Sequence, residues 1–156
     1  MKFSTREDIT APIDFVYDQL TDFTAFEQAG RDRGIDFRRT DDLTVAGLGM
    51  GWDVDFHFRG KARQISMKVT RFERPDALEF TGQSSSFDLS IAVLLTALSS
   101  ARTRVQVGID VRPRTLGARL MLQSAKLGRA SLDRKFDRRI AAYAREIEAR
   151  HLTALS

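Results

Sequence analysis

The sequence predicts an α+β protein in which a curved antiparallel β-sheet, with two short helices after its first strand, wraps around a long C-terminal helix. Three observations lead to this prediction. A strand-like segment and two short helical segments open the chain, alternating strand patterns fill most of residues 35–113, and one amphipathic helical pattern closes it. A curved sheet that faces a single helix tends to leave a cavity between them, so this plan predicts a binding fold.

The N-terminal segment predicts one strand. Residues 2–9 alternate between two faces, and Phe3, Thr5, Glu7 and Ile9 share the inward one. A period of two residues is typical of a strand with one buried face. Glu7 is the single charged member of the inward set, and it therefore draws attention as a candidate functional group.

Two short helices are expected next. Thr10 is the expected N-cap of the first, with Pro12 among its first residues, where a missing N–H costs nothing. Asp22 or Thr24 is expected to cap the second helix. Apolar residues follow at helical spacings. In the first helix they are Ile13, Val16, Tyr17 and Leu20, and in the second Phe23, Phe26 and Ala29.

From residue 35 onward the sequence predicts strands joined by short turns. The clearest strand is 52–58, where Trp52, Val54, Phe56 and Phe58 alternate with polar residues. Strands with such short connections pair antiparallel. The later strands continue the inner face with Ile65, Met67, Val69, Leu78, Phe80, Phe87, Leu89, Ile91, Val93, Leu95, Thr103, Val105, Val107, Ile109 and Val111.

A single helix from about Thr115 to His151 is expected to close the chain after Pro113 stops the last strand. It would be roughly 50 Å long at about 1.5 Å per residue. Gly117 and Gly128 are the expected places for a frayed start and a bend. Its apolar stripe, interrupted by Ser124 and Ser131, consists of Leu116, Leu120, Leu127, Phe136, Ile140, Tyr143 and Ile147.

Composition indicates one domain covering residues 1–156. The chain is 42% apolar, with 3 Pro and 10 Gly, as is typical of one globular domain. It has no Cys, and this absence excludes disulfides, thiolate nucleophiles and Cys-based zinc sites. The charged start does not have the pattern of a signal peptide. The longest apolar run, Ile91–Leu98, is far shorter than the roughly 20 residues of a membrane-spanning helix. We therefore expect a cytoplasmic protein without a membrane span.

Positive charge is concentrated near the C-terminus. Residues 101–156 carry 13 Lys/Arg and 5 Asp/Glu, although the whole chain has a net charge of only +4. This surplus could serve an anionic partner, or the long side chains could cover the helix's own apolar stripe and pair with acidic neighbours. The second interpretation is favoured because Asp133, Asp137, Glu146 and Glu148 are interspersed, so a nucleic-acid partner is not expected.

The run Ile91–Leu95 is apolar on both faces of its strand. A homodimer contact could bury the outer face of this strand. Shielding by neighbouring side chains explains the pattern equally well.

Ligand-binding residues are expected on the inner faces of the sheet and of the helices. The chain has 11 Phe residues, and large apolar side chains line ligand pockets as well as cores. The expected pocket wall consists of Phe23, Phe26, Trp52, Phe56, Phe58, Met67, Phe80, Phe87, Leu120, Ser124, Leu127 and Ser131.

Glu7 is the sole catalytic candidate. Inside a poorly hydrated pocket it could act as an acid, a base or an anchor for a ligand hydroxyl; alternatively, strand twist brings it to solvent or to an arginine such as Arg104. His57 should face outward and His151 lies near a helix end, so no His-centred triad or metal site is expected. Gly47–Gly51 lacks the Lys-Ser/Thr of a phosphate-binding loop and is expected to border the pocket mouth.

Several local motifs occur together in this chain: Ile9-x-Ala11-Pro12, Val16-Tyr17 and Leu20-x-Asp22 after the first strand, Gly51 before a strand, and Arg102-Thr103-Arg104-Val105 opening the last strand. With the long closing helix, they resemble the START-like superfamily, the SRPBCC group that includes Bet v 1-like allergens, lipid-transfer domains and the polyketide cyclase/dehydrase family. The resemblance covers nearly the whole chain and implies a helix-grip fold. The Arg, Tyr and Trp constellation of polyketide aromatases and cyclases cannot be placed here, so no catalytic residue is carried over.

Three functions follow as hypotheses. The leading one is a cofactor-free and metal-free protein that binds a hydrophobic lipid, isoprenoid or polyketide-like molecule between the sheet and the C-terminal helix, gated by the two short helices and by Gly47–Gly51. The second is a cyclase/dehydratase-type enzyme in which Glu7 or a helix serine positions the substrate. The third is a protein- or RNA-interaction module that uses the basic helix and would bind in a salt-dependent way.

Overall fold

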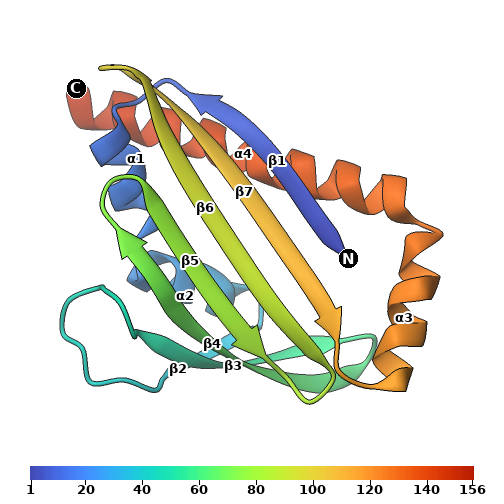
Figure 1. The fold of residues 1–156 in the computed structure, drawn as a ribbon. Coiled ribbons are helices and arrows are strands. Elements are labelled where there is room, and N and C mark those ends of the chain that lie inside the picture. The colour runs from blue at the N-terminus through green and yellow to red at the C-terminus, as the bar shows by residue number, and fades with distance from the viewer.

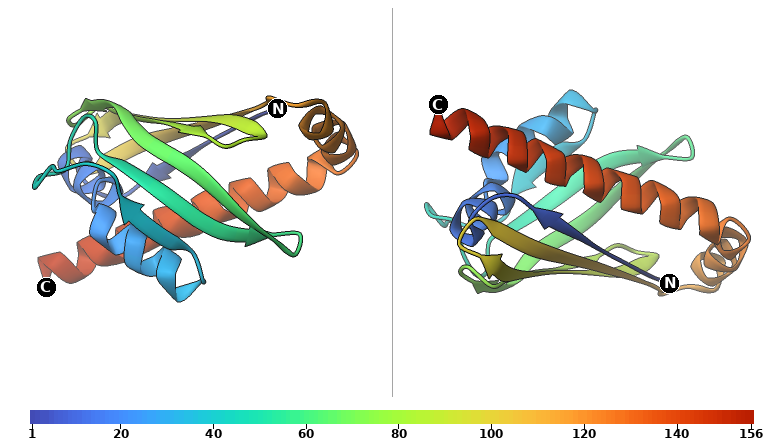
Figure 2. Two further views of the ribbon diagram at one scale, coloured as in Figure 1. Left: turned by 90° about the horizontal axis from the view of Figure 1, so that it is seen from below. Right: turned by 90° about the horizontal axis from the view of Figure 1, so that it is seen from above.

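The computed structural model describes residues 1–156 and confirms the predicted α+β architecture (Figure 1). A curved seven-stranded sheet has α4 along its inner face, with α1 and α2 at one end and α3 at the other (Figure 2). The elements in chain order are β1 (Lys2–Ile9), α1 (Ile13–Leu20), α2 (Phe23–Asp32), β2 (Asp36–Arg39), β3 (Gly51–Phe58), β4 (Lys61–Glu73), β5 (Ala77–Gln83), β6 (Phe87–Ser99), β7 (Arg102–Pro113), α3 (Leu116–Lys126) and α4 (Arg129–Leu155). None of these helices is both long enough and apolar enough to span a membrane.

The sheet is an antiparallel meander with one long-range closure. Its strand order is β1-β7-β6-β5-β4-β3-β2, so β2 to β7 each pair with strands adjacent in sequence. β1 instead pairs with the last strand, with Lys2 opposite Asp110 and Ile9 opposite Thr103. The predicted alternation is confirmed, since Val69 on the inner face is 1% exposed while its neighbours Lys68 and Thr70 are exposed.

The first helix begins later than the sequence predicted. Pro12, not Thr10, occupies the N-cap position of α1. The turn between β1 and α1 is held by the Ala11 N–H, which donates to the Ile9 carbonyl at 2.9 Å. The Thr10 N–H donates to Glu148 Oε2 on α4 at 2.7 Å, so Thr10 joins two elements and caps neither.

The second helix begins where the sequence predicted. The Asp22 side chain accepts a hydrogen bond from the Ala25 N–H at 3.2 Å and so caps α2. Near its end, α2 lies directly against β2. A Cβ atom added at Gly30 would come within 2.1 Å of Phe37 Cε2, so a larger residue here would displace the Phe37 ring.

The predicted C-terminal helix is two helices. α4 is the expected long helix of 27 residues, but the segment before it forms the separate helix α3, which turns away at Leu127 and Gly128. The prediction of one helix starting at Thr115 was therefore wrong, because Gly128 breaks the helix completely. α3 has its own inner side around Ala118, which is 3% exposed, whereas Leu116, Leu120 and Leu127 are 73%, 57% and 91% exposed.

The best-packed part of the core lies beside α1. Tyr17 is fully buried there, and its hydroxyl donates to the Ala77 carbonyl at 3.0 Å. Its ring packs edge-on against Phe72 at 5.6 Å between centroids. On the opposite side of the same region, Ile147 of α4 is 1% exposed. This end of the molecule is a closed core, and the open space lies beyond it, beneath α2.

Candidate functional site

An apolar cavity of about 350 Å³ lies between the inner face of the sheet and α2. Twelve residues line it, and eleven of them are hydrophobic. They come from α1, α2 and strands β2 to β6, and α4 contributes none. The sequence predicted a cavity walled by the C-terminal helix, whereas α2 provides the helical wall here. The lining residues are Leu20, Phe23, Phe26, Glu27, Phe37, Trp52, Val54, Met67, Leu78, Phe80, Ile91 and Val93.

Three aromatic rings form a fixed corner of this cavity. Phe23 on α2 packs edge-on against Trp52 on β3 at 5.2 Å and against Phe80 on β5 at 5.9 Å between centroids. The rings of Trp52 and Phe80 lie 6.4 Å apart. Edge-to-face pairs of this kind are favourable and hold their partners in one orientation. The corner therefore presents a rigid apolar surface to whatever enters the cavity.

Glu27 is the only polar residue on the cavity wall. The Trp52 Nε1–H donates to Glu27 Oε1 at 2.8 Å, and Arg31 Nη2 lies 3.7 Å from Glu27 Oε2. These partners fix the carboxylate at the margin of the cavity, where it can accept a further hydrogen bond from a hydroxyl or amide. Glu27 was not among the residues predicted from the sequence, although its position four residues after Phe23 places both on one face of the helix.

A second hollow of about 520 Å³ lies outside this cavity, between α2 and α4. Phe26 lines both hollows, and its ring lies 5.7 Å from that of Tyr143 on α4. The Tyr143 hydroxyl donates to the Gln19 carbonyl at 3.3 Å, and burial raises the pKa of this tyrosine to about 12. The aromatic pair thus separates the inner cavity from the outer hollow. The outer hollow is lined by Ala25, Phe26, Ala29, Arg33, Arg139, Ala142, Tyr143, Glu146 and Arg150.

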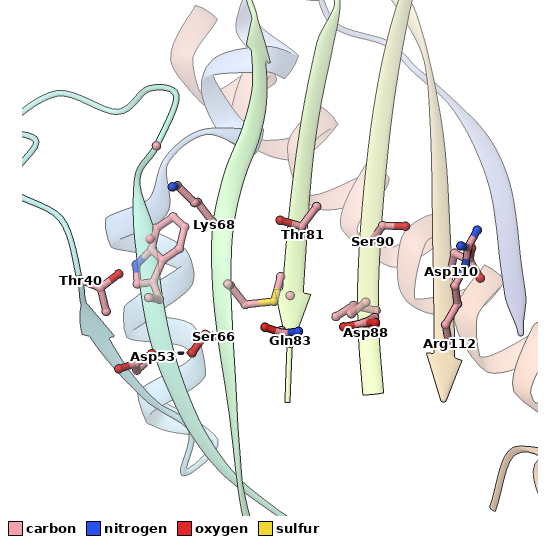
Figure 3. Close-up of a pocket in the computed structure, with 16 residues that line it drawn as sticks. Thr40, Asp53, Ser66, Lys68, Thr81, Gln83, Asp88, Ser90, Asp110 and Arg112 are labelled. Carbon is pink, nitrogen blue, oxygen red and sulfur yellow. Dashed lines mark hydrogen bonds and ion pairs between the residues drawn. The ribbon is translucent and has the colours of Figure 1, made fainter. Parts of the chain in front are cut away.

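The largest hollow, about 860 Å³, lies on the outer face of the sheet (Figure 3). Its polar side chains stand on the face away from the helices, and two pairs of them are bonded to each other: Ser66 donates to Asp53 at 2.8 Å, and Arg112 donates to Asp110 at 2.9 Å. Only three of its sixteen lining residues are hydrophobic. A shallow, solvated polar surface offers little driving force for binding a small molecule, so the smaller apolar cavity is the better candidate site.

The structure places five of the twelve predicted pocket residues on the cavity wall, namely Phe23, Phe26, Trp52, Met67 and Phe80. The other seven do not line it. Phe56 packs against the main core, and Phe87 is half-buried at the start of β6. Phe58 is 48% exposed at the β3–β4 turn, where Arg59 and Arg63 lie over its ring at 5.4 and 5.7 Å.

The remaining four predicted pocket residues are on α3 or beside the helix break. Leu120, Ser124, Leu127 and Ser131 are all exposed. Their prediction assumed one continuous helix whose stripe faces the sheet. The break at Gly128 gives α3 its own orientation, so positions that would have continued the inner stripe of α4 face solvent instead.

Glu7 does not lie on the cavity wall either. It belongs to β1 at the edge of the sheet, and its Oε2 lies 3.6 Å from Arg145 Nη2 on α4. Of the two positions considered for Glu7, the structure shows the one beside an arginine. The partner is Arg145 and not Arg104, because Arg104 pairs with Asp8. Asp8 has a pKa below its usual range because Arg104 donates to its carboxylate.

The glycine-rich loop also differs from the expectation. Gly49 and Gly51 border the outer-face hollow, and no residue of Gly47–Gly51 lines the apolar cavity. The Gly49 N–H donates to the Val69 carbonyl at 3.0 Å, so the loop is fastened to β4. His57 is exposed, His151 packs against Phe15 at 4.8 Å, and no cluster of three or more His, Cys, Asp or Glu side chains is arranged to hold a metal ion.

A sheet that grips a long C-terminal helix, with two short helices after strand one and an apolar cavity beneath them, defines the helix-grip class. Comparison with solved structures shows the START-like fold. The aromatase/cyclase Zhui from Streptomyces sp. R1128 superposes with a TM-score of 0.66 at 15% identity, over 96% of this chain and 94% of that one. The protein TTHA0849 from Thermus thermophilus gives 0.64 at 14% identity over 100% of both chains. A START superfamily protein from Mycobacterium smegmatis gives 0.58 at 14% identity, over 86% of this chain and 95% of that one.

The sequence itself matches no family model and no curated protein. At identities of 14–15%, the structural likeness establishes the fold alone.

Proposed function

We propose that this protein binds a hydrophobic small molecule in the cavity beneath α2. The observation that carries the proposal is the cavity itself, which has about 350 Å³ of space and eleven hydrophobic residues among twelve. Small-molecule sites typically have volumes of roughly 300–1,000 Å³ and apolar walls with few polar groups. Transfer of apolar surface from water to such walls supplies the binding free energy.

The volume limits the class of ligand. A cavity near the lower end of the usual range suits a molecule of one or two rings or a short single chain, such as an isoprenoid, an aromatic polyketide-like compound or a single-chain lipid. A phospholipid with two chains exceeds it. Glu27 adds a directional element, because a ligand hydroxyl close to the cavity margin can donate to its carboxylate.

A second candidate function is catalysis by the same site. Glu27 is an ionisable group on an apolar wall, which is the setting of many general acids and bases, and it replaces Glu7 in this hypothesis. The similarity in fold to an aromatase/cyclase supports this second function, for which we propose an enolisable, polyketide-like substrate. The variant Glu27→Gln separates the two functions. Loss of turnover with retained binding would support the enzyme, and unchanged turnover of any substrate found would remove it.

The binding proposal is tested with the fluorescent apolar probe N-phenylnaphthylamine. Trp52 is the only tryptophan of the chain and lies on the cavity wall, so a bound probe should quench its emission and itself become brighter. The variant Ile91→Phe places extra atoms in the cavity and should abolish saturable binding. The control Ile109→Phe makes the same change at the residue paired with Ile91 on the adjacent strand. Ile109 does not line the cavity.

The comparison of these variants decides the proposal. Binding that persists in Ile91→Phe, or that disappears equally in Ile109→Phe, would place the probe elsewhere and refute the assignment. Thermal unfolding of both variants establishes that each remains folded at the assay temperature.

A further inference from the structure

We propose that the ligand is an anionic amphiphile, whose apolar body lies in the inner cavity and whose charged group binds Arg33 and Arg139 in the outer hollow between α2 and α4. This inference rests on the proposed function and specifies its ligand class. It assigns the outer hollow as the entrance and as the charged half of one continuous site.

The two hollows form one path because they share a wall. Phe26 contributes to both, and beyond it the outer hollow continues between facing stripes of two helices. On α2 the stripe contains Ala25 and Ala29, and on α4 it contains Ala142 and Tyr143. Ala25 and Ala29 are four residues apart and therefore lie on one face of α2, and the alanines of both helices leave room between them. A ligand passing Phe26 would thus move from an apolar groove into an apolar cavity.

Phe26 is suited to the role of a movable partition. Its side chain is 40% exposed, unlike that of Phe23, which is 8% exposed and fixed between Trp52 and Phe80. On the other side of the partition, the hydroxyl of Tyr143 is held by the Gln19 carbonyl. Rotation of Phe26 alone would therefore join the two hollows, because exposed side chains change rotamer rapidly.

The rim of the outer hollow carries an excess of positive charge. Three arginines and one glutamate line it. Arg150 is occupied, since it donates to Gln19 Oε1 at 3.1 Å and lies 3.7 Å from the carboxylate of Glu146. Arg33 and Arg139 have neither an ion pair nor a side-chain hydrogen bond. Two guanidinium groups are therefore free to bind an anion at the mouth of an apolar path.

The position of Glu27 agrees with this polarity. Its carboxylate is already bonded to Trp52 and lies on the other side of α2 from Arg33. Because Glu27 is also paired with Arg31, the inner cavity offers no free cation to an anionic group, which the unpaired arginines of the rim attract instead. The charges thus orient a bound amphiphile with its apolar end inward.

The test uses two probes that differ only in a sulfonate group. Anilinonaphthalene sulfonate is anionic, and N-phenylnaphthylamine is its neutral counterpart; both become fluorescent in apolar surroundings. The variants are Arg33→Gln, Arg139→Gln and the double substitution. The control is Arg119→Gln with Arg134→Gln, which removes the same charge from exposed arginines that line neither hollow and make no ion pair.

The expected result is a loss that depends on the sulfonate. Each single variant should weaken the anionic probe about threefold and the double variant about tenfold, as for exposed ion pairs, with the neutral probe unchanged. The control pair should leave both affinities within about twofold, because neither arginine lines the inner cavity or the outer hollow. Displacement of the anionic probe by decanoate more strongly than by decanol would support a single-chain carboxylate, and displacement by naphthoate an aromatic one.

The opposite results separate the two proposals. Suppose that the neutral probe binds, but that the control pair lowers the affinity for the anionic probe as much as the Arg33 and Arg139 variants do. The assignment of the charged group to the rim is then overturned, whereas the proposal that the cavity binds an apolar molecule remains. If the neutral probe fails to bind the wild-type protein, the proposed function falls, and this inference with it.

Discussion

Thr103 holds the segment that leads into the cavity-covering helices. It lies on β7 opposite Ile9, and its Oγ1 donates to the Ala11 carbonyl at 2.8 Å. Both Thr103 and Ala11 are 0% exposed, and Ala11 O has no other hydrogen-bond donor in the protein. Since Ala11 immediately precedes Pro12 and α1, this one bond fixes where the path of α1 and α2 begins.

The substitution Thr103→Val keeps the shape of the side chain and removes the donor. The Ala11 carbonyl is then buried without a partner, which costs about 1–3 kcal/mol of unfolding free energy. Thr103→Ser keeps the donor and loses one buried methyl group, worth about 1 kcal/mol. For a chain of this size, a central loss of about 2 kcal/mol in the valine variant corresponds to a fall in Tm of roughly 4–8 °C.

Urea unfolding measures this difference directly. The midpoint should fall in the order wild type, Thr103→Ser, Thr103→Val, with an unchanged denaturant slope that indicates the same exposed surface. A valine variant as stable as wild type, or more stable than the serine variant, would show that the Ala11 carbonyl does not depend on this donor. The reasoning about the β1–α1 turn would then be wrong.

Three further predictions concern titration, the site and the fold. Burial raises the pKa of Tyr17 above 10.0 and raises that of Tyr143 from 10.0 to about 12. The free energy of unfolding should therefore fall between pH 10 and about 12, where the unfolded chain loses these protons and the folded protein keeps them. Half-titration of the tyrosine absorbance of the folded protein by pH 10 would contradict this. Glu27→Gln should retain probe binding but shift the Trp52 emission, because a neutral amide replaces the carboxylate that accepts the hydrogen bond of the Trp52 indole. An unchanged emission spectrum would exclude that hydrogen bond in solution. Gly30→Ala should lower Tm, since its Cβ meets Phe37, whereas Gly117→Ala, with open space around it, should not; equal melting would refute the close approach.

The sheet could be predicted well from the sequence because its pattern is local. Alternation of apolar and polar residues reports which face is buried, whatever the neighbouring strand is, and Val54, Val69 and Val93 all face inward as expected. The cap of α2 was likewise predictable, because Asp22 acts on a backbone group only three residues away.

The parts that were missed depend on distances between elements. A bend was expected at Gly128, but the apolar pattern continues across it and does not indicate a complete break that exposes Leu120 and Leu127. Which helix covers the cavity is set by how α2 packs on β2, through the contact of Gly30 with Phe37. Glu27 was missed because a charged residue on a short helix is ordinarily solvated, and only Trp52 from a distant strand shows that this one faces inward.

The pairing of β1 with β7 has a consequence for synthesis on the ribosome. Strands β2 to β7 pair with their sequence neighbours, so they can assemble progressively as the chain emerges. β1 is made first, but its partner residues 103–110 follow about a hundred positions later, and α4, which packs on it, comes later still. Until then the N-terminal strand has unpaired backbone groups and an apolar face open to other chains. The interval between the synthesis of β1 and that of β7 is therefore the one in which a nascent-chain chaperone would bind this strand.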